Sequence, residues 1–231
     1  MSFEILPAFY LISDFTDMGD IIKPELYRED GKLCIKSGEL SLCADFSELK
    51  RRVKPGSINL EPLVKAIKSK GESLNIVDAT AGLGEDSFIM AAAGHSVTMF
   101  ERDETIASLL EDALKRGADD EEISETIKRM KLIKGDSVKH MKELDFVPDV
   151  VLLDPMFPKR TKSALVKKKF QILKLIEPPE ADGEALVDAA LSTGARKIII
   201  KRPAKGELLG GIKPSYSIDG KSVRWDVIVR A

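Results

Sequence analysis

LNIVDATAGLGEDSFIMAAAG, residues 74–94, carries the pattern from which the fold follows. Its first part, 74–80, is a short apolar run that reaches a carboxylate at Asp78, as a buried β-strand does where it leaves the core. After a loop with two glycines, 85–94 places apolar residues at helical spacing and stops at Gly94, a common helix terminator. The stretch therefore predicts a strand, a glycine loop and a helix.

The alternation of strand and helix continues toward the C-terminus. Further strands are predicted at 96–102, 131–137, 149–154 and 196–202, and helices at 104–117 with Asp103 as its cap, around 123–130, and from Ser163 onward. The closing segment, 214–231, predicts a β-hairpin with its turn at Asp219-Gly220. Alternating β and α elements predict a mainly parallel sheet with helices on both faces, to which the hairpin adds antiparallel strands at one edge. The fold class is therefore α/β and Rossmann-like.

The first quarter of the chain has a different character. KLCIKSGELSLCADF, residues 32–46, has two β-prone runs around a turn at Ser37-Gly38, as a hairpin would. Pro55-Gly56 then interrupts the chain. We therefore expect an N-terminal β-containing extension, 1–56, as a candidate for contacting the substrate, and a second domain, 57–231, that holds the main sheet.

Composition excludes several classes of protein. Of 231 residues, 43% are hydrophobic and 32% charged, so a packed core is expected and disorder is not. No run approaches the roughly 20 apolar residues of a membrane span, and the first residues carry acids rather than a basic leader. Cys34 and Cys43, with only two histidines in the chain, indicate neither a metal site nor a disulfide framework. We expect a reduced, cytoplasmic protein without metal.

Polar residues follow the end of each predicted strand, where a parallel sheet binds its ligands. After the first strand, Gly82 and Gly84 let the backbone turn tightly beside a ligand. Ser87 stands where the dinucleotide fingerprint would have a third glycine, which disfavours a diphosphate. Asp78 is a poor neighbour for a diphosphate but a good one for a cationic amino acid or a sulfonium.

The next two strand ends suit a nucleoside. Glu101 ends the second strand, where a carboxylate can accept hydrogen bonds from both hydroxyls of a ribose. Asp136 and Ser137 end the third, where they can bind an adenine amine, cap the next helix, or do both.

The fourth strand ends in VVLLDPMFP, residues 150–158. A carboxylate at Asp154 can accept hydrogen bonds from an exocyclic amine, and Pro155 stiffens the backbone beside it. Phe157 can stack on a flat base, which is worth roughly 1–3 kcal/mol. These parts suit methylation of an amine whose lone pair is delocalised into a ring, because acceptors for its hydrogens can turn the lone pair outward. The alternative is a loop of packing prolines with a core phenylalanine.

Basic residues gather in three short runs on a chain whose net charge is only −2. The runs 50–54, 159–169 and 201–205 could guide a polyanion, or could be ordinary solvated faces. The candidate polyanion contacts are Lys159, Arg160, Lys162, Ser163, Lys167, Lys168, Lys201 and Arg202.

The segments DATAGLGEDSF, FERD, LLDPMFP and KSALVKK, with KRP at 201–203, resemble the bacterial small-subunit rRNA guanine-N2 methyltransferases of the RsmJ (YhiQ) family. The resemblance runs from about residue 45 to the C-terminus. It implies a class I methyltransferase that uses S-adenosylmethionine (SAM) to methylate N2 of one guanosine near the 3′ end of 16S rRNA. The partner would be 16S rRNA or the small ribosomal subunit.

The resemblance also implies which residues contact the donor. These are Glu85, Asp86, Glu101, Arg102, Asp136, Ser137 and Asp154, and the strand ends add Asp78, Gly82 and Gly84. The residues assigned to catalysis are Asp154, Pro155 and Phe157.

Two other functions stay open. A methyltransferase for another exocyclic amine, such as DNA adenine, would usually have a second proline and a tyrosine where this chain has Met156 and Phe157. A nucleotide-binding oxidoreductase, or an RNA-binding protein without turnover, would also suit Glu101, because NAD offers the same ribose hydroxyls.

Overall fold

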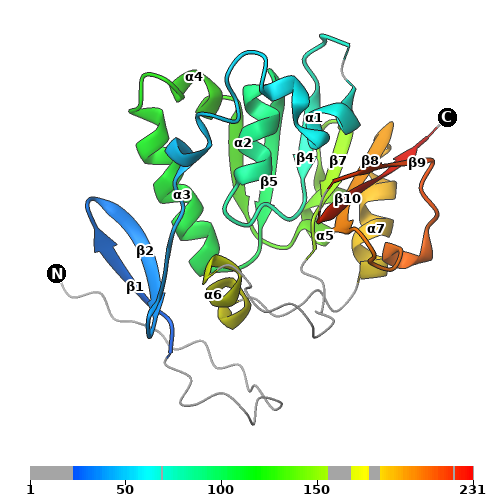
Figure 1. Cartoon of the computed structure of the whole chain (residues 1–231). Coiled ribbons are helices and arrows are strands. Elements are labelled where there is room, and N and C mark those ends of the chain that lie inside the picture. The colour runs from blue at the N-terminus through cyan, green and yellow to red at the C-terminus, as the bar shows by residue number, and fades with distance from the viewer. Residues whose placement is uncertain (1–22, 69, 156–167, 177–182, 221, 231) are drawn as a thin grey trace.

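The computed structural model describes residues 23–68, 70–155, 168–176, 183–220 and 222–230. Its centre is a seven-stranded sheet (Figure 1). In spatial order the strands are β6 (Met130–Lys134), β5 (Ser96–Glu101), β4 (Asn75–Asp78), β7 (Val150–Leu153), β8 (Lys197–Pro203), β10 (Val223–Val229) and β9 (Tyr216–Asp219). The first five run parallel, and β10 pairs antiparallel with both β8 and β9. The predicted α/β class with an antiparallel C-terminal edge is confirmed.

Helices cover both faces of this sheet. The α-helices are α1 (Pro62–Ile67), α2 (Glu85–Ala92), α3 (Glu104–Ala118), α4 (Ser124–Ile127), α5 (Ser137–His140), α6 (Lys168–Ile176) and α7 (Gly183–Ser192). Short 3-10 helices are η1 (Phe46–Leu49), η2 (Ile58–Leu60), η3 (Met141–Glu143) and η4 (Leu209–Gly211). None of the helices within the described ranges combines the length and apolar character that crossing a bilayer requires.

Alternation along the strands divides the core into two layers. On β7, Val150 and Leu152 pack with residues of α1, α2, α3 and α6, whereas Val151 and Leu153 pack with residues of α7 and η3. Successive side chains of a strand point to opposite faces, so a strand buried on both sides is apolar throughout. The continuous apolar run that predicted this strand is explained by that burial.

A second sheet lies beside α3 (Figure 1). It contains β1 (Glu25–Glu29), β2 (Lys32–Ser37) and β3 (Leu40–Cys43), all antiparallel. The nearly buried Asp112 of α3 holds it in place, since its carboxylate accepts hydrogen bonds from Arg28 Nη1 and from the Leu33 amide, each at 3.0 Å. Because a charged acceptor roughly doubles the strength of a hydrogen bond, Asp112 helps to hold the sheet against α3, together with Ile35 and Leu42, which are buried in the main core.

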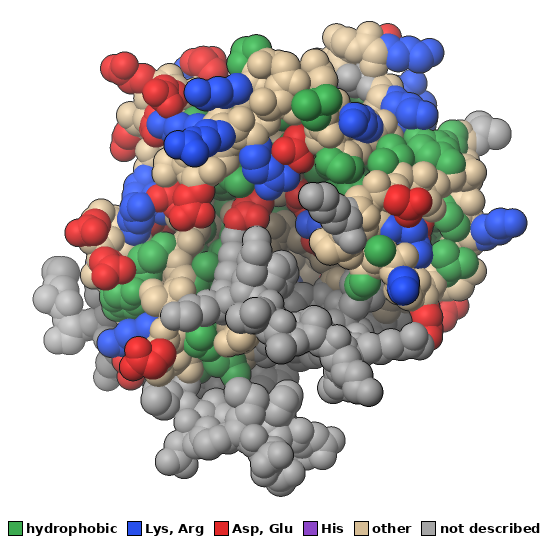
Figure 2. Space-filling view, in the orientation of Figure 1, with side chains coloured by type: hydrophobic (Ala, Val, Ile, Leu, Met, Phe, Trp, Pro, Cys, Tyr) green, Lys and Arg blue, Asp and Glu red, His purple; other side chains and the backbone are tan. Residues whose placement is uncertain are grey.

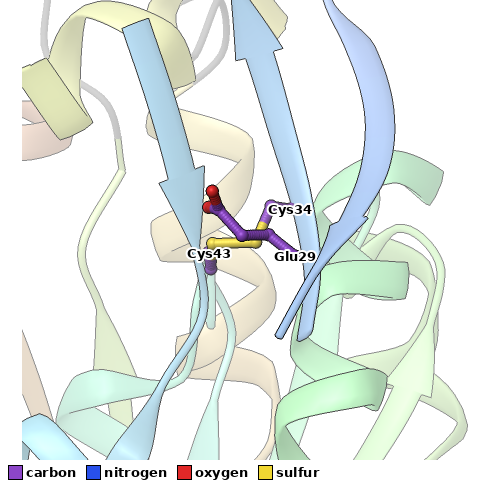
Figure 3. Close-up of side chains that lie close together, drawn as sticks. All are labelled: Glu29, Cys34 and Cys43. Atoms are coloured by element: carbon purple, nitrogen blue, oxygen red, sulfur yellow. A yellow bond between two sulfur atoms is a disulfide. The ribbon is translucent and has the colours of Figure 1, made fainter. Parts of the chain in front are cut away.

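The expectation of two free cysteines is wrong, because Cys34 and Cys43 form a disulfide. The hairpin places them directly opposite each other, with their Cα atoms 4.3 Å apart. Figure 3 shows Glu29 beside this pair, and its carboxylate and the two sulfur atoms all lie within 4.8 Å of one another. With the sulfur atoms bonded to each other, they are not available as thiolate ligands for a metal.

The structure differs from the prediction at three other places. The hairpin turn is Gly38-Glu39, one residue later than predicted, because Ser37 still pairs with Leu40. Strand β1 was not predicted, since its residues are mostly polar and exposed and show no apolar alternation. The helix expected around 123–130 is only the single turn α4, and Met130 instead begins β6. Ile123 and Ile127 do share a helical turn, since the Ile127 amide donates to the Ile123 carbonyl at 3.0 Å, and only Met130 belongs to another element.

The glycine loop gives the first testable prediction. Gly84 has φ +75°, and a Cβ there would lie 2.6 Å from Leu110 Cδ1 and 3.3 Å from Phe46 Cζ. We expect Gly84→Ala to lower the free energy of unfolding by about 2–3 kcal/mol in urea titrations, since it adds overpacking to backbone strain. Gly82→Ala is the matched control, because Gly82 also has positive φ but open space around it, so about 1 kcal/mol is expected. Equal losses in the two variants would exclude the packing explanation.

Candidate active site

The carboxyl ends of β4, β5, β6 and β7 open into one cavity of about 400 Å³, a size typical of small-molecule sites. The cavity lies where the winding of the sheet reverses, since β4 is flanked by β5 on one side and β7 on the other. This is the place where open α/β sheets bind ligands. Figure 2 shows acidic side chains gathered at the margin of a hollow near the centre of the visible face.

All of the predicted donor contacts except Gly84 line this cavity. They are Asp78, Gly82, Glu85, Asp86, Glu101, Arg102, Asp136, Ser137 and Asp154. Gly84 instead begins α2 and packs against Leu110 and Phe46. The sequence therefore predicted a set of residues that the fold brings together from four separate strand ends.

Glu101 holds the glycine loop as well as lining the cavity. It is only 4% exposed, and its two oxygens accept hydrogen bonds from the amides of Gly82 and Asp103, both at 2.8 Å. A carboxylate oxygen can accept more than one hydrogen bond, so this arrangement is compatible with binding ribose hydroxyls. The carboxylate is thus fixed in position before any ligand arrives.

Asp136 has the capping role that the sequence allowed. Its carboxylate accepts a hydrogen bond from the amide of Val138 at 2.9 Å and so begins α5. Asp136 and the mostly buried Ser137 both line the cavity together with Val138. The cap fixes the carboxylate at the cavity wall, where an adenine amine would meet it.

Asp78 is 2% exposed at the end of β4. Its carboxylate accepts hydrogen bonds from Ser87 Oγ at 2.6 Å and from the Thr80 amide at 3.1 Å. Burial raises the pKa of Asp78 to about 7, although these hydrogen bonds oppose the shift. Ser87, which counted in the sequence only as a missing glycine, therefore orients the carboxylate behind the glycine loop.

The raised pKa of Asp78 predicts a pH-dependent stability. The folded protein holds this proton more tightly than the unfolded chain, in which the carboxyl titrates near 3.8. Between about pH 4 and about pH 7 the contribution of Asp78 to the free energy of unfolding should fall as the pH rises. Asp78→Asn should remove that loss in urea titrations at about pH 5 and about pH 8. Asp188→Asn, at an exposed site on α7, is the control and should leave the fall in the free energy of unfolding unchanged. If Asp78→Asn loses as much stability between the two pH values as the unmodified protein, the raised pKa does not belong to Asp78.

Asp154 begins the loop after β7 and faces the same cavity. Its backbone amide donates to Thr80 Oγ1 at 2.6 Å, which joins the loops that follow β4 and β7. Its Oδ2 lies 2.8 Å from Lys201 Nζ, and 34% of its side chain is exposed. Loss of water around the carboxyl raises the pKa of Asp154, and Lys201 opposes that effect. Pro155 is buried at the cavity wall.

Several predicted site residues are not described. Phe157, Lys159, Arg160, Lys162, Ser163 and Lys167 lie outside the described residues, and the side chain of Lys168, which begins α6, is not described either. Their roles in catalysis and RNA binding remain predictions.

Lys201 and Arg202 do not form the joint RNA-binding surface that the sequence suggested. Neighbouring residues on a strand point to opposite faces, so Lys201 faces the cavity while Arg202 is 3% exposed behind the sheet. The basic run 50–54 is also partly neutralised, because Lys50 pairs with Asp120 and Arg52 with Glu61.

The residues that line the cavity fit SAM. The ribose of the donor would bind Glu101, its adenine would lie near Asp136 and Ser137 beside the apolar Ile106 and Val138, and its cationic end would meet Asp78 and Asp86. Gly82 has φ +55°, which gives the loop a tight turn, and the space where a Cβ would lie is open. A pyrophosphate would place negative charge against these carboxylates, so NAD fits less well.

Such a sheet, with this cavity and an antiparallel edge at its C-terminus, defines a class I SAM-dependent methyltransferase. A family model for SAM-dependent methyltransferases matches residues 26–230. The crystal structure of a SAM-dependent methyltransferase from Neisseria gonorrhoeae superposes with a TM-score of 0.73 at 29% identity, covering 93% of this chain and 86% of that one.

Curated relatives define the family more narrowly. The protein named ribosomal RNA small subunit methyltransferase J from Thioalkalivibrio sulfidiphilus is 44% identical over 176 residues, which are 75% of this chain and 69% of that protein. The protein of the same name from Tolumonas auensis is 42% identical over 189 residues, 80% of this chain and 76% of the relative. The chain belongs to the ribosomal RNA small subunit methyltransferase J family.

Proposed function

We propose that this protein transfers a methyl group from SAM to the exocyclic N2 of one guanosine in 16S rRNA, giving N2-methylguanosine, and that it acts in the cytoplasm. The observation that carries the proposal is the position of Asp154. Its partly exposed carboxylate stands at the wall of a cavity whose other strand ends suit the donor. The names of the relatives refer to small-subunit ribosomal RNA, which supports the choice of substrate.

The residues of the site would act mainly by positioning. SAM supplies a methyl group on a sulfonium: as the amine nitrogen bonds to the methyl carbon, the electron pair of the carbon–sulfur bond stays on sulfur, and one amine proton is released. Asp154 would accept a hydrogen bond from the amine and turn its lone pair toward the cavity. Because the proton can leave after the nitrogen is methylated, the carboxylate need not be a strong base. Electrostatics and orientation then supply most of the rate.

The RNA would bind around the mouth of this cavity. We propose that the basic run 159–169 contacts phosphates, that Phe157 stacks on the target base, and that the extension 1–56 contributes to substrate binding. The charge of the run and its place directly after the Asp154-Pro155 corner support this assignment. Phosphate contacts position a nucleic acid without reading its sequence.

Nucleoside mass spectrometry tests the proposal. The protein would be incubated with SAM carrying an isotopically labelled methyl group and, in parallel, with protein-free 16S rRNA, small ribosomal subunits or double-stranded DNA. We expect labelled N2-methylguanosine from one of the two RNA substrates. Label that appears only as methyladenine in DNA, or in no nucleic acid, would refute it.

A further inference from the structure

Lys201 occupies an unusual position for a surface cation. It lies on β8, and its Nζ is 2.5 Å from Asp86 Oδ2 and 2.8 Å from Asp154 Oδ2. The ammonium also lies 5.3 Å from the centre of the Trp225 ring, on the neighbouring strand β10. It thus joins the first turn of α2, on the donor side of the cavity, to the strand end that would meet the substrate.

The charges around Lys201 explain why a cation is needed there. Among the described residues that line the cavity, carboxylates outnumber cations, and Arg102 is the cation besides Lys201. The carboxylates are Asp78, Glu85, Asp86, Glu101, Asp136 and Asp154. The negative charge of Asp86 helps to raise the pKa of both Asp78 and Asp154. Without a cation, carboxylates this close would not all remain ionised.

The two carboxylates beside Lys201 also set the pKa of its ammonium. Burial acts to lower the pKa of Lys201, but the carboxylates of Asp86 and Asp154 outweigh it and raise that pKa above its ordinary value. Lys201 is therefore charged at any pH at which the protein functions. A lysine with two carboxylate partners is also poorly suited to bind an RNA phosphate.

We propose that Lys201 is a positioning residue for methyl transfer, whose ammonium keeps Asp154 ionised and holds Oδ2 so that the other oxygen accepts from the target amine. This inference rests on the proposed function. It assigns Lys201 to the chemistry of the site in place of the RNA contact that the sequence suggested. Asp86, bonded to the same ammonium, couples that orientation to the glycine loop on the donor side.

The test compares Lys201→Met with Lys201→Arg and with Lys197→Met in rRNA methylation assays. At about pH 7 we expect Lys201→Met to lower kcat by about 10²-fold, the size expected when one fixed electrostatic partner is lost. The activity of this variant should recover as the pH is raised, because Asp154 then ionises without help. Lys201→Arg should restore most of the activity and the pH profile of the unmodified protein.

Lys197→Met is the matched control for loss of a lysine on the same strand. Lys197 begins β8, and its Nζ donates to the backbone carbonyls of Ala66 and Ile67, away from the cavity. We expect the kcat and the pH profile of Lys197→Met to equal those of the unmodified protein. If Lys201→Met folds, by circular dichroism and thermal melting, and keeps both its kcat and its pH profile, the inference is wrong.

A second outcome also contradicts it. If Lys201→Met loses the fold, Lys201→Arg must still give most of the activity with an unchanged pH profile, and a changed profile in that folded variant would overturn the role. Inactivity of the unmodified protein on all RNA substrates would instead refute the proposed function, so the two failures are distinguishable.

Discussion

Asp154→Asn is expected to lower kcat for rRNA methylation by at least about 10²-fold while S-adenosylhomocysteine still binds. Asparagine has nearly the same shape but loses the charge that draws the amine hydrogens. The side chain is 34% exposed, and the hydrogen bond to Thr80 comes from the backbone amide, so both asparagine and alanine should leave the fold intact. Single-turnover methylation measures the rate, and isothermal titration calorimetry measures binding of S-adenosylhomocysteine.

Asp149→Asn is the matched control for this variant. Asp149 precedes the other end of β7, where its carboxylate accepts from the Asn75 amide at 2.9 Å and pairs with Arg196. It lies outside the lining of the cavity, so its loss should not change kcat. A folded Asp154→Asn with normal turnover would remove Asp154 from the chemistry, and an unfolded Asp154→Ala would make its role structural.

Glu101→Gln should weaken donor binding by about 10- to 100-fold, because hydrogen bonds to a charged acceptor contribute about 1.5–3 kcal/mol. The loss has two sources. First, Glu101 uses two oxygens to accept from the amides of Gly82 and Asp103, whereas glutamine has only one carbonyl oxygen. Second, glutamine would bind the ribose hydroxyls without a negative charge. Calorimetry with S-adenosylhomocysteine checks the affinity directly.

Glu104→Gln serves as the control for loss of a nearby negative charge. Glu104 lies in the first turn of α3, is exposed, and is absent from the cavity wall. The affinity of the Glu104→Gln variant for S-adenosylhomocysteine should equal that of the unmodified protein. Unchanged affinity in a folded Glu101→Gln would place the ribose elsewhere.

The sequence predicted the parts of this fold that repeat a simple pattern. Apolar runs became strands buried on both faces, and the apolar stripe of 104–117 became α3, with the Asp103 carboxylate capping it at 2.9 Å from the amides of Thr105 and Ile106. The residues that line the cavity were predictable as a group because they lie at strand ends or in the segments that follow them, and parallel strands end at one edge of their sheet.

Contacts between distant segments were not predictable in this way. The Cys34–Cys43 bond depends on the register of a hairpin, which shifts with the position of its turn. The anchor at Asp112 depends on where a separate sheet packs against α3. Arg202 was assigned to RNA from its charge alone, although the alternation along β8 buries it. Each of these required knowledge of which face of an element meets its neighbour.

A crystal structure with bound S-adenosylhomocysteine tests most directly whether the donor and the target amine meet at Asp154. We expect the ribose on Glu101, the adenine beside Asp136 and Ser137, and the thioether sulfur facing the cavity wall at Asp154 and Pro155. A ligand bound in another orientation, with its sulfur far from Asp154 or outside this cavity, would contradict it.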